Sequence, residues 1–214
     1  MTDVETRARA PRRAAAVPPA DKVAARRSEL AAAALKTLSE LGYARTSLRE
    51  IAQNSEFSHG VLHYYFRDKV DLITYCVREY NAQCVTRYDT VVATAATAQE
   101  LAAGFLHKLG ETLVEDAALH RLWYDLRSQS MFEPSFRDDV AAIDASLERM
   151  IWRIVSRYAE LTGTTPDPAP ATLYAVLDGL FQQALLRHLG GDAGAAEDLR
   201  TAVGRLLPAL LRPT

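Results

Sequence analysis

The sequence predicts an all-α protein with about nine helices. Three observations carry this prediction. Apolar residues recur at three- and four-residue intervals along most of the chain, which is the period of an amphipathic helix. Residues typical of helix caps stand where these stretches begin, and Gly or Pro stands where several of them end or restart.

Composition and charge narrow the class of protein. The chain has 214 residues, of which 49% are hydrophobic, and a formal net charge of −2, so it can bury a sizeable core. The charge is unevenly distributed. Residues 1–69 contain 12 Lys and Arg against 8 Asp and Glu, whereas residues 70–214 contain 13 against 19. The N-terminal third of the chain is therefore basic and the rest is acidic. This distribution is expected when the N-terminal part binds DNA and the rest of the protein does not.

Membrane insertion and disulfide formation are not expected. No apolar run reaches the ~18 residues that a membrane span needs, and no signal peptide is evident, so we expect a cytoplasmic protein. Cys76 and Cys84 fall in one predicted helix, with Cα atoms roughly 12 Å apart. This exceeds the ~7 Å limit for a bridge within one chain. For both residues, buried core cysteine is favoured over a thiol sensor.

The chain begins with a predicted arm and a first helix. Residues 1–21 are rich in Arg, Ala and Pro and lack an apolar period, so we expect a disordered basic arm. It is either a solvated tail or a segment that lies along phosphates or a minor groove. The following helix, residues 22–41, is Ala-rich with one apolar stripe and ends at Gly42.

Two short helices joined by a tight turn follow. Ser47 and Glu50 form a capping box, so the first of them begins at Ser47. Ser58 caps the second, and Asp68 caps the next helix. The inward positions of the second short helix are Leu62, Tyr65 and Phe66.

The second short helix leaves small, aromatic and imidazole side chains on its outer face. That arrangement is typical of a helix-turn-helix that reads DNA, although an ordinary three-helix core is the alternative. The candidate phosphate contacts are Thr46, Ser47, Tyr64 and Lys69, and the candidate base-edge contacts are His59, Gly60, Val61 and His63.

Several motifs within this region occur in a known family. They are Glu40-Leu41-Gly42-Tyr43, Thr46-Ser47, Ile51-Ala52, Gly60 to Phe66, Asp68-Lys69 and Leu72. With them, residues 26–72 resemble the DNA-binding domain of the TetR family of bacterial transcriptional regulators. The string His63 to Lys69 also resembles the branch that contains the betaine and choline regulator BetI.

The resemblance implies an all-helical dimer, most often a repressor. Such a regulator binds a palindromic operator in double-stranded DNA and releases it when a small molecule enters the C-terminal domain. On this basis we expect a DNA-binding domain at residues 22–68 and a ligand-binding and dimerisation domain at 69–214. Two residues depart from the family. Glu56 stands where a Gly usually permits a left-handed turn, and His63 replaces the usual Tyr, so base preference does not carry over.

Six helices are expected after the DNA-binding region. The fourth helix starts beside that region, so a tilt at its far end would move the recognition helix. The last two have excess apolar surface, which predicts a homodimer through a four-helix bundle. The TTPDPAP segment, residues 164–170, is expected to be a stiff linker. The predicted ranges are 68–92, 99–114, 117–131, 134–161, 171–189 and 195–211.

The helical body is expected to hold a pocket for an unknown small-molecule effector. Trp123, Tyr124 and Tyr80 near a carboxylate such as Asp144 or Asp178 suggest a cage for a quaternary ammonium ligand through cation–π attraction. Plain core packing is the alternative for each position. The candidate lining residues are Tyr80, Cys84, Phe105, Trp123, Tyr124, Arg127, Met131, Ile143, Asp144, Leu147, Ile151, Tyr174 and Phe181.

Two other classes of protein were weighed against a regulator. The chain has no Gly-rich phosphate loop, no Cys or His metal spacing and no Gly-x-Ser-x-Gly motif, and its five His are scattered along it. We therefore expect no catalytic residue, no metal and no cofactor. A non-regulatory architectural DNA-binding protein remains an alternative, and a helical enzyme is a weaker one.

Overall fold

The computed structural model describes residues 20–213, so the predicted arm at residues 1–21 lies outside the described residues except for its last two. No helix in this range is both long and apolar enough to cross a membrane. The described residues form ten α-helices, one 3₁₀ turn and one pair of strands. They are α1 (Ala20–Leu41), α2 (Leu48–Gln53), α3 (His59–Tyr65), α4 (Lys69–Cys84), α5 (Asp89–Thr94), α6 (Ala98–Glu115), α7 (Ala117–Gln129), η1 (Pro134–Phe136), α8 (Arg137–Thr162), β1 (Thr164–Pro166), α9 (Pro170–Leu189), α10 (Ala195–Ala209) and β2 (Leu211–Pro213).

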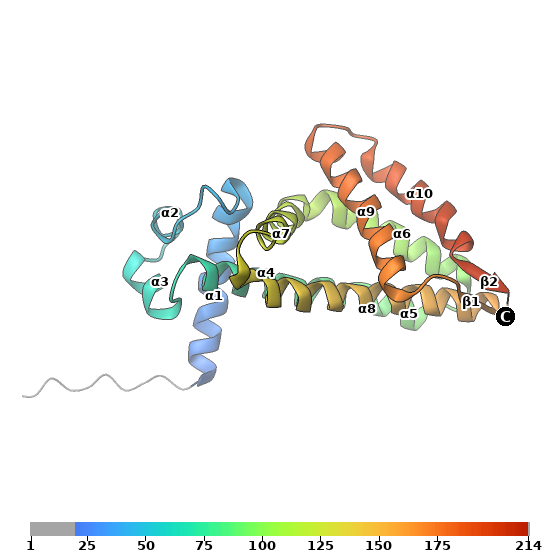
Figure 1. Ribbon diagram of the computed structural model, residues 1–214, viewed down its shortest axis with the longest axis horizontal. Coiled ribbons are helices and arrows are strands. Elements are labelled where there is room, and N and C mark those ends of the chain that lie inside the picture. Colours follow the sequence, from blue (N-terminus) through green and yellow to red (C-terminus); the bar gives the residue numbers. More distant parts are fainter. Residues whose placement is uncertain (1–19, 214) are drawn as a thin grey trace, which may run out of the picture.

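The molecule is elongated, with different elements at its two ends (Figure 1). Helices α2 and α3 lie at one end, and the strands and the C-terminus lie at the other. Helix α1 packs against α4 and α7, while α9 packs against α8 and α10. The predicted recognition helix α3 is therefore far from the helices predicted to form the dimer interface.

Helix starts predicted from capping residues are confirmed. Ser47 Oγ accepts a hydrogen bond from Glu50 N at 3.2 Å, and the Glu50 carboxylate accepts one from Ser47 N at 2.7 Å. Ser58 and Asp68 cap α3 and α4 in the predicted way. The sequence analysis missed a second capping box at the start of α6, formed by Thr97 and Glu100. These side chains satisfy backbone donors that the first helical turn leaves unpaired.

The helix predicted at residues 68–92 is interrupted, which accounts for a tenth helix. α4 ends at Cys84, and a turn leads to α5. In that turn, Arg87 donates hydrogen bonds to Thr112 and Asp116, each at 2.5 Å. Tyr88 is only 4% exposed. The apolar spacing continues through the turn because Tyr88 still reaches the core, so the period did not reveal the break.

The segment predicted as a stiff linker contains a strand. β1 pairs antiparallel with β2, so that Thr164 lies opposite Pro213 and Pro166 lies opposite Leu211. The last predicted helix therefore ends at Ala209, two residues before the predicted end. This pairing ties the end of α10 to the end of α8.

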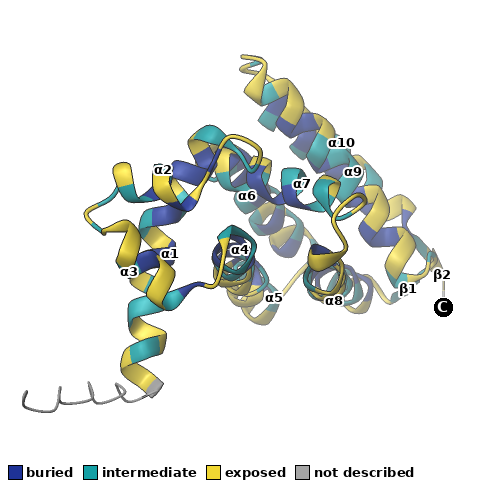
Figure 2. Ribbon diagram, turned by 60° about the vertical axis from the view of Figure 1, so that its left-hand side comes forward, coloured by how far each residue is buried: buried dark blue, intermediate teal, exposed yellow. Residues whose placement is uncertain are grey.

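Buried side chains form two clusters that meet in the middle of the molecule (Figure 2). The first joins α1–α4 with α7 and the beginning of α8, and the second joins α6, α8, α9 and α10. Tyr124 and Leu147 pack against both. The first cluster contains residues from both sides of position 68, so helices α1–α3 share their core with the body. Its fully buried members include Ile51, Leu62, Phe66, Leu126 and Phe136.

Cys76 and Cys84 are buried and unbridged, as their spacing predicts. Burial raises the pKa of both thiols. The reactive thiolate is therefore rare at neutral pH, which supports the core interpretation over a thiol sensor.

Gly163 should be required by the backbone at the end of α8. Its φ of +65° is in the left-handed region. We expect Gly163→Ala to lower the free energy of unfolding by about 1 kcal/mol, because a Cβ disfavours this conformation. Urea denaturation measures the change. Gly163→Asn is the matched control and should lose less unfolding free energy, because Asn tolerates the left-handed region. Equal losses of unfolding free energy in the two variants would contradict this explanation.

Candidate functional site

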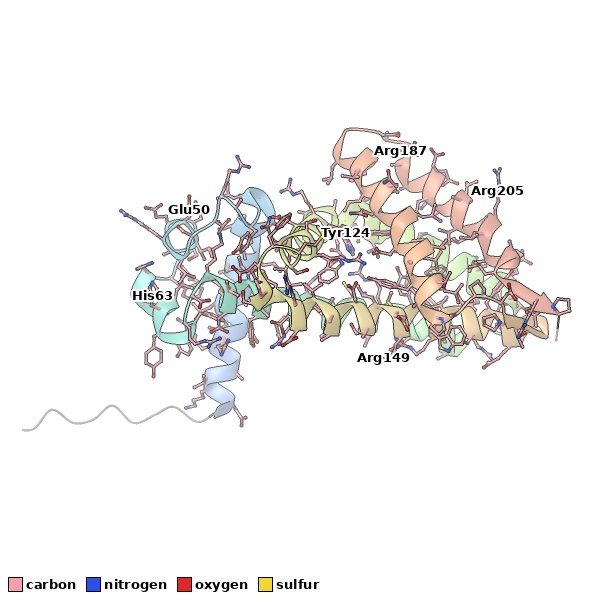
Figure 3. The ribbon with its side chains drawn as sticks, in the orientation of Figure 1. Glu50, His63, Tyr124, Arg149, Arg187 and Arg205 are labelled. Atoms are coloured by element: carbon pink, nitrogen blue, oxygen red, sulfur yellow. The ribbon has the colours of Figure 1, made fainter. Side chains whose placement is uncertain are left out.

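The outer face of α3 is open to solvent. His59, Gly60, His63 and Tyr64 are exposed, whereas Leu62 on the opposite face is fully buried. Figure 3 shows His63 at the end of the molecule, directed away from the body. Val61 is half-buried. A short helix that presents these side chains without a covering element has the form needed to enter a major groove.

Two of the candidate phosphate contacts lie at helix ends beside α3. Ser47 is exposed, and because its Oγ accepts the capping bond, its hydroxyl hydrogen remains available as a donor. Lys69 Nζ donates to Tyr43 O at 2.5 Å and lies 3.8 Å from the centroid of the Tyr43 ring. Partial burial lowers the pKa of Lys69. Lys69 therefore holds the segment between α1 and α2 as well as carrying a positive charge.

Thr46 was predicted to face outward and contact a phosphate, but it faces inward. Its side chain is 3% exposed, and its hydroxyl donates to Gly42 O at 2.7 Å. The hydroxyl closes the turn between α1 and α2, so it is not available to a phosphate.

The turn around Glu56 differs from the left-handed turn that a Gly would permit. Within residues 20–213, no residue other than Gly has a positive φ, so Glu56 imposes no strain of that kind. The sequence analysis also passed over three exposed arginines near the reading face, Arg45, Arg49 and Arg67. Their charge and their proximity to capped helix starts were the available signal.

A cavity lies in the body between α4 and α10. It holds about 680 Å³ of space free of protein atoms, including its opening to solvent. Its walls are mainly aromatic and aliphatic, as is usual for small-molecule sites. The lining residues are Cys84, Arg87, Tyr88, Phe105, Leu109, Thr112, His120, Trp123, Tyr124, Leu147, Met150, Ile151, Tyr174, Leu177, Asp178, Phe181 and Val203.

The cavity brings together most of the predicted lining residues. Cys84, Phe105, Trp123, Tyr124, Leu147, Ile151, Tyr174 and Phe181 line it. Tyr80 and Ile143 line a smaller adjoining cavity that shares Trp123 with the main one. Arg127 and Asp144 do not line either cavity but contact residues that do. Met131 is wrongly predicted, because it lies beyond the end of α7 with 67% of its side chain exposed.

The sequence analysis missed several lining residues for identifiable reasons. Arg87 and Thr112 resemble surface residues in the sequence, and Tyr88 belongs to the unpredicted turn. His120 was noted only as one of the scattered histidines. The spacing of apolar residues within one helix cannot show which helices face a common space.

Asp178 in the cavity wall and Asp144 behind it share a single guanidinium, that of Arg127. Arg127 donates to Asp178 at 2.6 Å and lies 3.5 Å from Asp144. Tyr124 in turn donates to Asp178 at 2.9 Å, and Tyr174 donates to Asp144 at 2.6 Å. Burial raises the pKa of both phenols, so they remain protonated donors. The formal charge of this group is −1.

The remaining polar groups of the cavity do not cancel that charge. Arg87 is paired with Asp116. Burial lowers the pKa of His120 to about 4, so its imidazole is neutral at pH 7. His120 Nε2 lies 3.1 Å from the Tyr80 hydroxyl. The indole N–H of Trp123 is buried and has no hydrogen-bond partner among the described residues.

Helix α7 connects this cavity to α1. His120, Trp123 and Tyr124 line the cavity from one side of α7, and Tyr124 is seen in Figure 3 between α7 and α9. From the same helix, Arg121 donates to the carbonyls of Ser39 and Glu40. Asp125 accepts from Tyr43 N at 2.7 Å. One short helix thus contacts both the cavity and the C-terminal end of α1.

Family comparisons agree with this division of the molecule. Residues 30–76 match the family described as "Bacterial regulatory proteins, tetR family". Residues 98–212, more than half of the chain, match "BetI-type transcriptional repressor, C-terminal". The chain belongs to the TetR family.

Individual relatives are similar over most of their length. The HTH-type transcriptional regulator BetI of Escherichia coli is 28% identical over 178 residues, covering 81% of this chain and 89% of the relative. The BetI of Burkholderia thailandensis is 27% identical over 174 residues, covering 80% and 87%. A transcriptional regulator from Saccharomonospora viridis, crystallised with choline, has the same fold, with a TM-score of 0.68 and 19% identity over 88% of this chain and 98% of that one.

Membership of the TetR family confirms the predicted resemblance, the all-helical fold class and the role of a DNA-binding transcriptional regulator. Regulators of this family bind DNA and small-molecule effectors and act as dimers. Most of the residues that line the cavity lie in the part of the chain that matches the BetI-type C-terminal family, whereas Cys84, Arg87 and Tyr88 precede it. Helix α3 lies within residues 30–76, the part that matches the tetR family.

The neutral state of His120 predicts a pH dependence of stability. The folded pKa is lowered from 6.5 to about 4, so below pH 6.5 the unfolded chain binds a proton that the folded chain does not. The contribution of His120 to stability should fall between pH 6.5 and 4, by roughly 3 kcal/mol in total.

Urea denaturation of the wild type and of His120→Gln at pH 7 and pH 5 measures this contribution. The wild type should lose more unfolding free energy than the variant on acidification. Equal losses would show that His120 is not buried in its neutral form.

Proposed function

We propose that this TetR-family regulator is a dimeric repressor that reads a palindromic operator through α3 and is released by a cationic small molecule. The observation that carries the proposal is an aromatic cavity beside a group with excess negative charge, joined by α7 to the end of the molecule that carries α3. Binding to chromosomal DNA would place the protein in the cytoplasm. We propose no enzymatic role.

For DNA reading, residues 22–68 act as the DNA-binding unit and residues 69–213 as the effector and dimerisation unit. His59, Gly60, Val61 and His63 contact base edges, while Ser47, Tyr64 and Lys69 contact phosphates. The exposure of these side chains supports the assignment, except that Lys69 and Val61 are half-buried. The exposed Arg45, Arg49 and Arg67 add positive charge beside them.

For dimerisation, α9 and α10 pair with the same helices of a second protomer. A shallow groove between them is lined by Val176, Gly179, Leu180, Ala202 and Leu206, among others. On α9, Leu186 and Leu189 are also exposed, by 58% and 43%. Burying this apolar surface in a two-fold four-helix bundle removes it from water.

For the effector, the cavity suits a quaternary ammonium compound such as choline. Aromatic rings attract a cation that cannot donate hydrogen bonds, and the charge of −1 on Arg127, Asp144 and Asp178 favours it further. The structural relative from S. viridis was crystallised with choline, which supports the same ligand class.

For release, α7 transmits occupancy of the cavity to α1. A ligand releases DNA only by binding the released conformation more tightly, and ~100-fold release needs roughly 2.7 kcal/mol of differential affinity. A ligand between α7 and α9 contacts Trp123 and Tyr124. A shift of α7 would then pull on the bonds that Arg121 and Asp125 make to α1 and to Tyr43.

Choline should bind the cavity more tightly than an uncharged molecule of the same shape. We expect 3,3-dimethylbutan-1-ol, which replaces the ammonium nitrogen with carbon, to bind at least about ten-fold more weakly because it lacks the cation–π and charge terms. Titration followed by tryptophan fluorescence and by melting temperature measures both affinities. Equal affinities, or no response to choline, would contradict the proposed ligand class.

Asp178→Asn should weaken choline binding by about ten-fold, because the charge of the Arg127 group rises from −1 to 0. Binding of the uncharged analogue should not change. Asp192→Asn, which removes a carboxylate from the loop between α9 and α10, is the matched control and should leave both affinities unaltered. If Asp178→Asn also weakens the binding of the uncharged analogue, the substitution has damaged the cavity itself.

Gly60→Ala should separate DNA reading from folding. A Cβ at Gly60 would meet only the Ser58 hydroxyl at 4.0 Å, so the variant should fold with unchanged or slightly higher stability. The wild type, incubated with fragmented DNA of its source at ~150 mM salt, should retain fragments that share a short palindrome. Gly60→Ala should lose this enrichment because the added methyl group blocks close approach to base edges.

Uniform retention of all fragments by the wild type would instead indicate an architectural DNA-binding protein. If Gly60→Ala enriches the palindromic fragments as strongly as the wild type, Gly60 is not part of the contact face.

Leu186→Glu should produce monomers, because it places a charge within the proposed interface. Phe132→Glu is the control, since Phe132 is 83% exposed at the turn after α7, away from α9 and α10. Light scattering after size-exclusion chromatography distinguishes the two states. A dimeric Leu186→Glu with a monomeric Phe132→Glu would place the interface elsewhere.

A further inference from the structure

Two imidazoles meet on the exposed face of α3. His59 is the first residue of the helix and His63 lies one turn later, so their side chains share a face. Their Nε2 atoms are 3.1 Å apart. The ring centroids are 4.4 Å apart and the ring planes are inclined by 83°. One nitrogen donates and the other accepts in this arrangement, and the tautomers decide which ring is the donor.

The separation of the two nitrogens also suits a metal ion. Zn–N bonds in proteins measure about 2.0–2.1 Å, so an ion bound equally to both Nε2 atoms would subtend an N–metal–N angle of about 95–100°. This angle lies between the ideal values for octahedral and tetrahedral coordination. Both side chains are exposed, so a small rotation of each ring can direct its Nε2 lone pair to a common point.

We propose that His59 and His63 form a two-histidine site for a divalent transition-metal ion on the DNA-reading face. The His-x-x-x-His spacing is the one by which a single helix presents two imidazoles to zinc. Imidazole ligands favour Zn²⁺, Ni²⁺ and Cu²⁺ over Mg²⁺ and Ca²⁺. The sequence analysis found no metal spacing because it compared the histidines as a scattered set of five, and not as a pair on one helical turn.

The site is open on the side away from the protein. No group of three or more possible ligands occurs within residues 20–213, so the ion would complete its coordination with water. Coordination would engage both Nε2 atoms and add two positive charges to the face of α3. The histidines could not then donate to base edges from Nε2, so metal occupancy and base reading by these atoms would exclude each other.

The nearest comparable group elsewhere supplies a control. On α6, His107 Nε2 lies 3.0 Å from the Glu111 carboxylate, again with four-residue spacing and with both side chains exposed. That pair offers one imidazole instead of two. A site that depends on paired imidazoles should therefore respond to changes at positions 59 and 63 and not at position 107.

Calorimetric titration of the full chain with Zn²⁺ at pH 7.5 tests the proposal. We expect one ion per chain, at least ten-fold weaker binding in His59→Ala and in His63→Ala, and unchanged binding in His107→Ala. Binding by the wild type should also be lost at pH 5, because metal ligation requires neutral imidazoles. Circular dichroism melting of each variant checks that the fold is retained, and His63→Gln repeats the test with a polar replacement.

The absence of Zn²⁺ binding by the wild type would overturn the proposal. So would binding that both alanine variants at positions 59 and 63 retain, or binding that His107→Ala weakens to the same extent. None of these outcomes depends on the identity of the effector or of the operator.

Discussion

The structure depends on a hydrophobic core that the DNA-reading helices share with the body. Leu62 and Phe66, beside the reading face, belong to the same buried cluster as Leu122, Trp123 and Leu126 of α7. Helices as short as α2 and α3 are marginal by themselves and gain their stability from such packing. The position of α3 is therefore tied to the position of α7. Trp123 also lines the cavity, so an occupant of the cavity contacts the shared core directly.

Electrostatics give the cavity its chemical character. Two carboxylates share Arg127, and the neighbouring phenols hold them in place as hydrogen-bond donors. A buried excess charge is unfavourable unless it is compensated. A bound cation would provide that compensation. His120 cannot, because its imidazole stays neutral at physiological pH. This arrangement is the basis for the proposed cationic ligand.

Local features of the fold could be predicted from the sequence, whereas features that depend on distant contacts could not. Ser47, Ser58 and Asp68 each act through neighbouring backbone atoms, so the sequence revealed the helix starts at those residues. The turn after α4 depends on Arg87 reaching Asp116, which lies between α6 and α7. The β1–β2 pair joins segments that are far apart in the sequence, and neither carries a strand pattern.

The candidate sites follow the same rule. The outer face of α3 was predictable because one helical turn determines which side chains point outward. Thr46 was misplaced because its hydroxyl bonds to Gly42, a contact that the residue type does not reveal. Most of the aromatic lining residues were recognised by type, with the exception of Tyr88, but Arg87 and His120 join them only through the packing of separate helices.

The most direct test of this account is the coupling between the cavity and the DNA. Choline should weaken the binding of the operator by the wild type, and the measured quantity is the ratio of operator Kd values with and without saturating choline. Replacing both Arg121 and Asp125 with Ala removes the bonds from α7 to α1 and to Tyr43. The account predicts that this variant still binds choline and operator, but that the ratio falls at least about ten-fold towards one. A variant that keeps the full ratio would show that α7 does not carry the coupling.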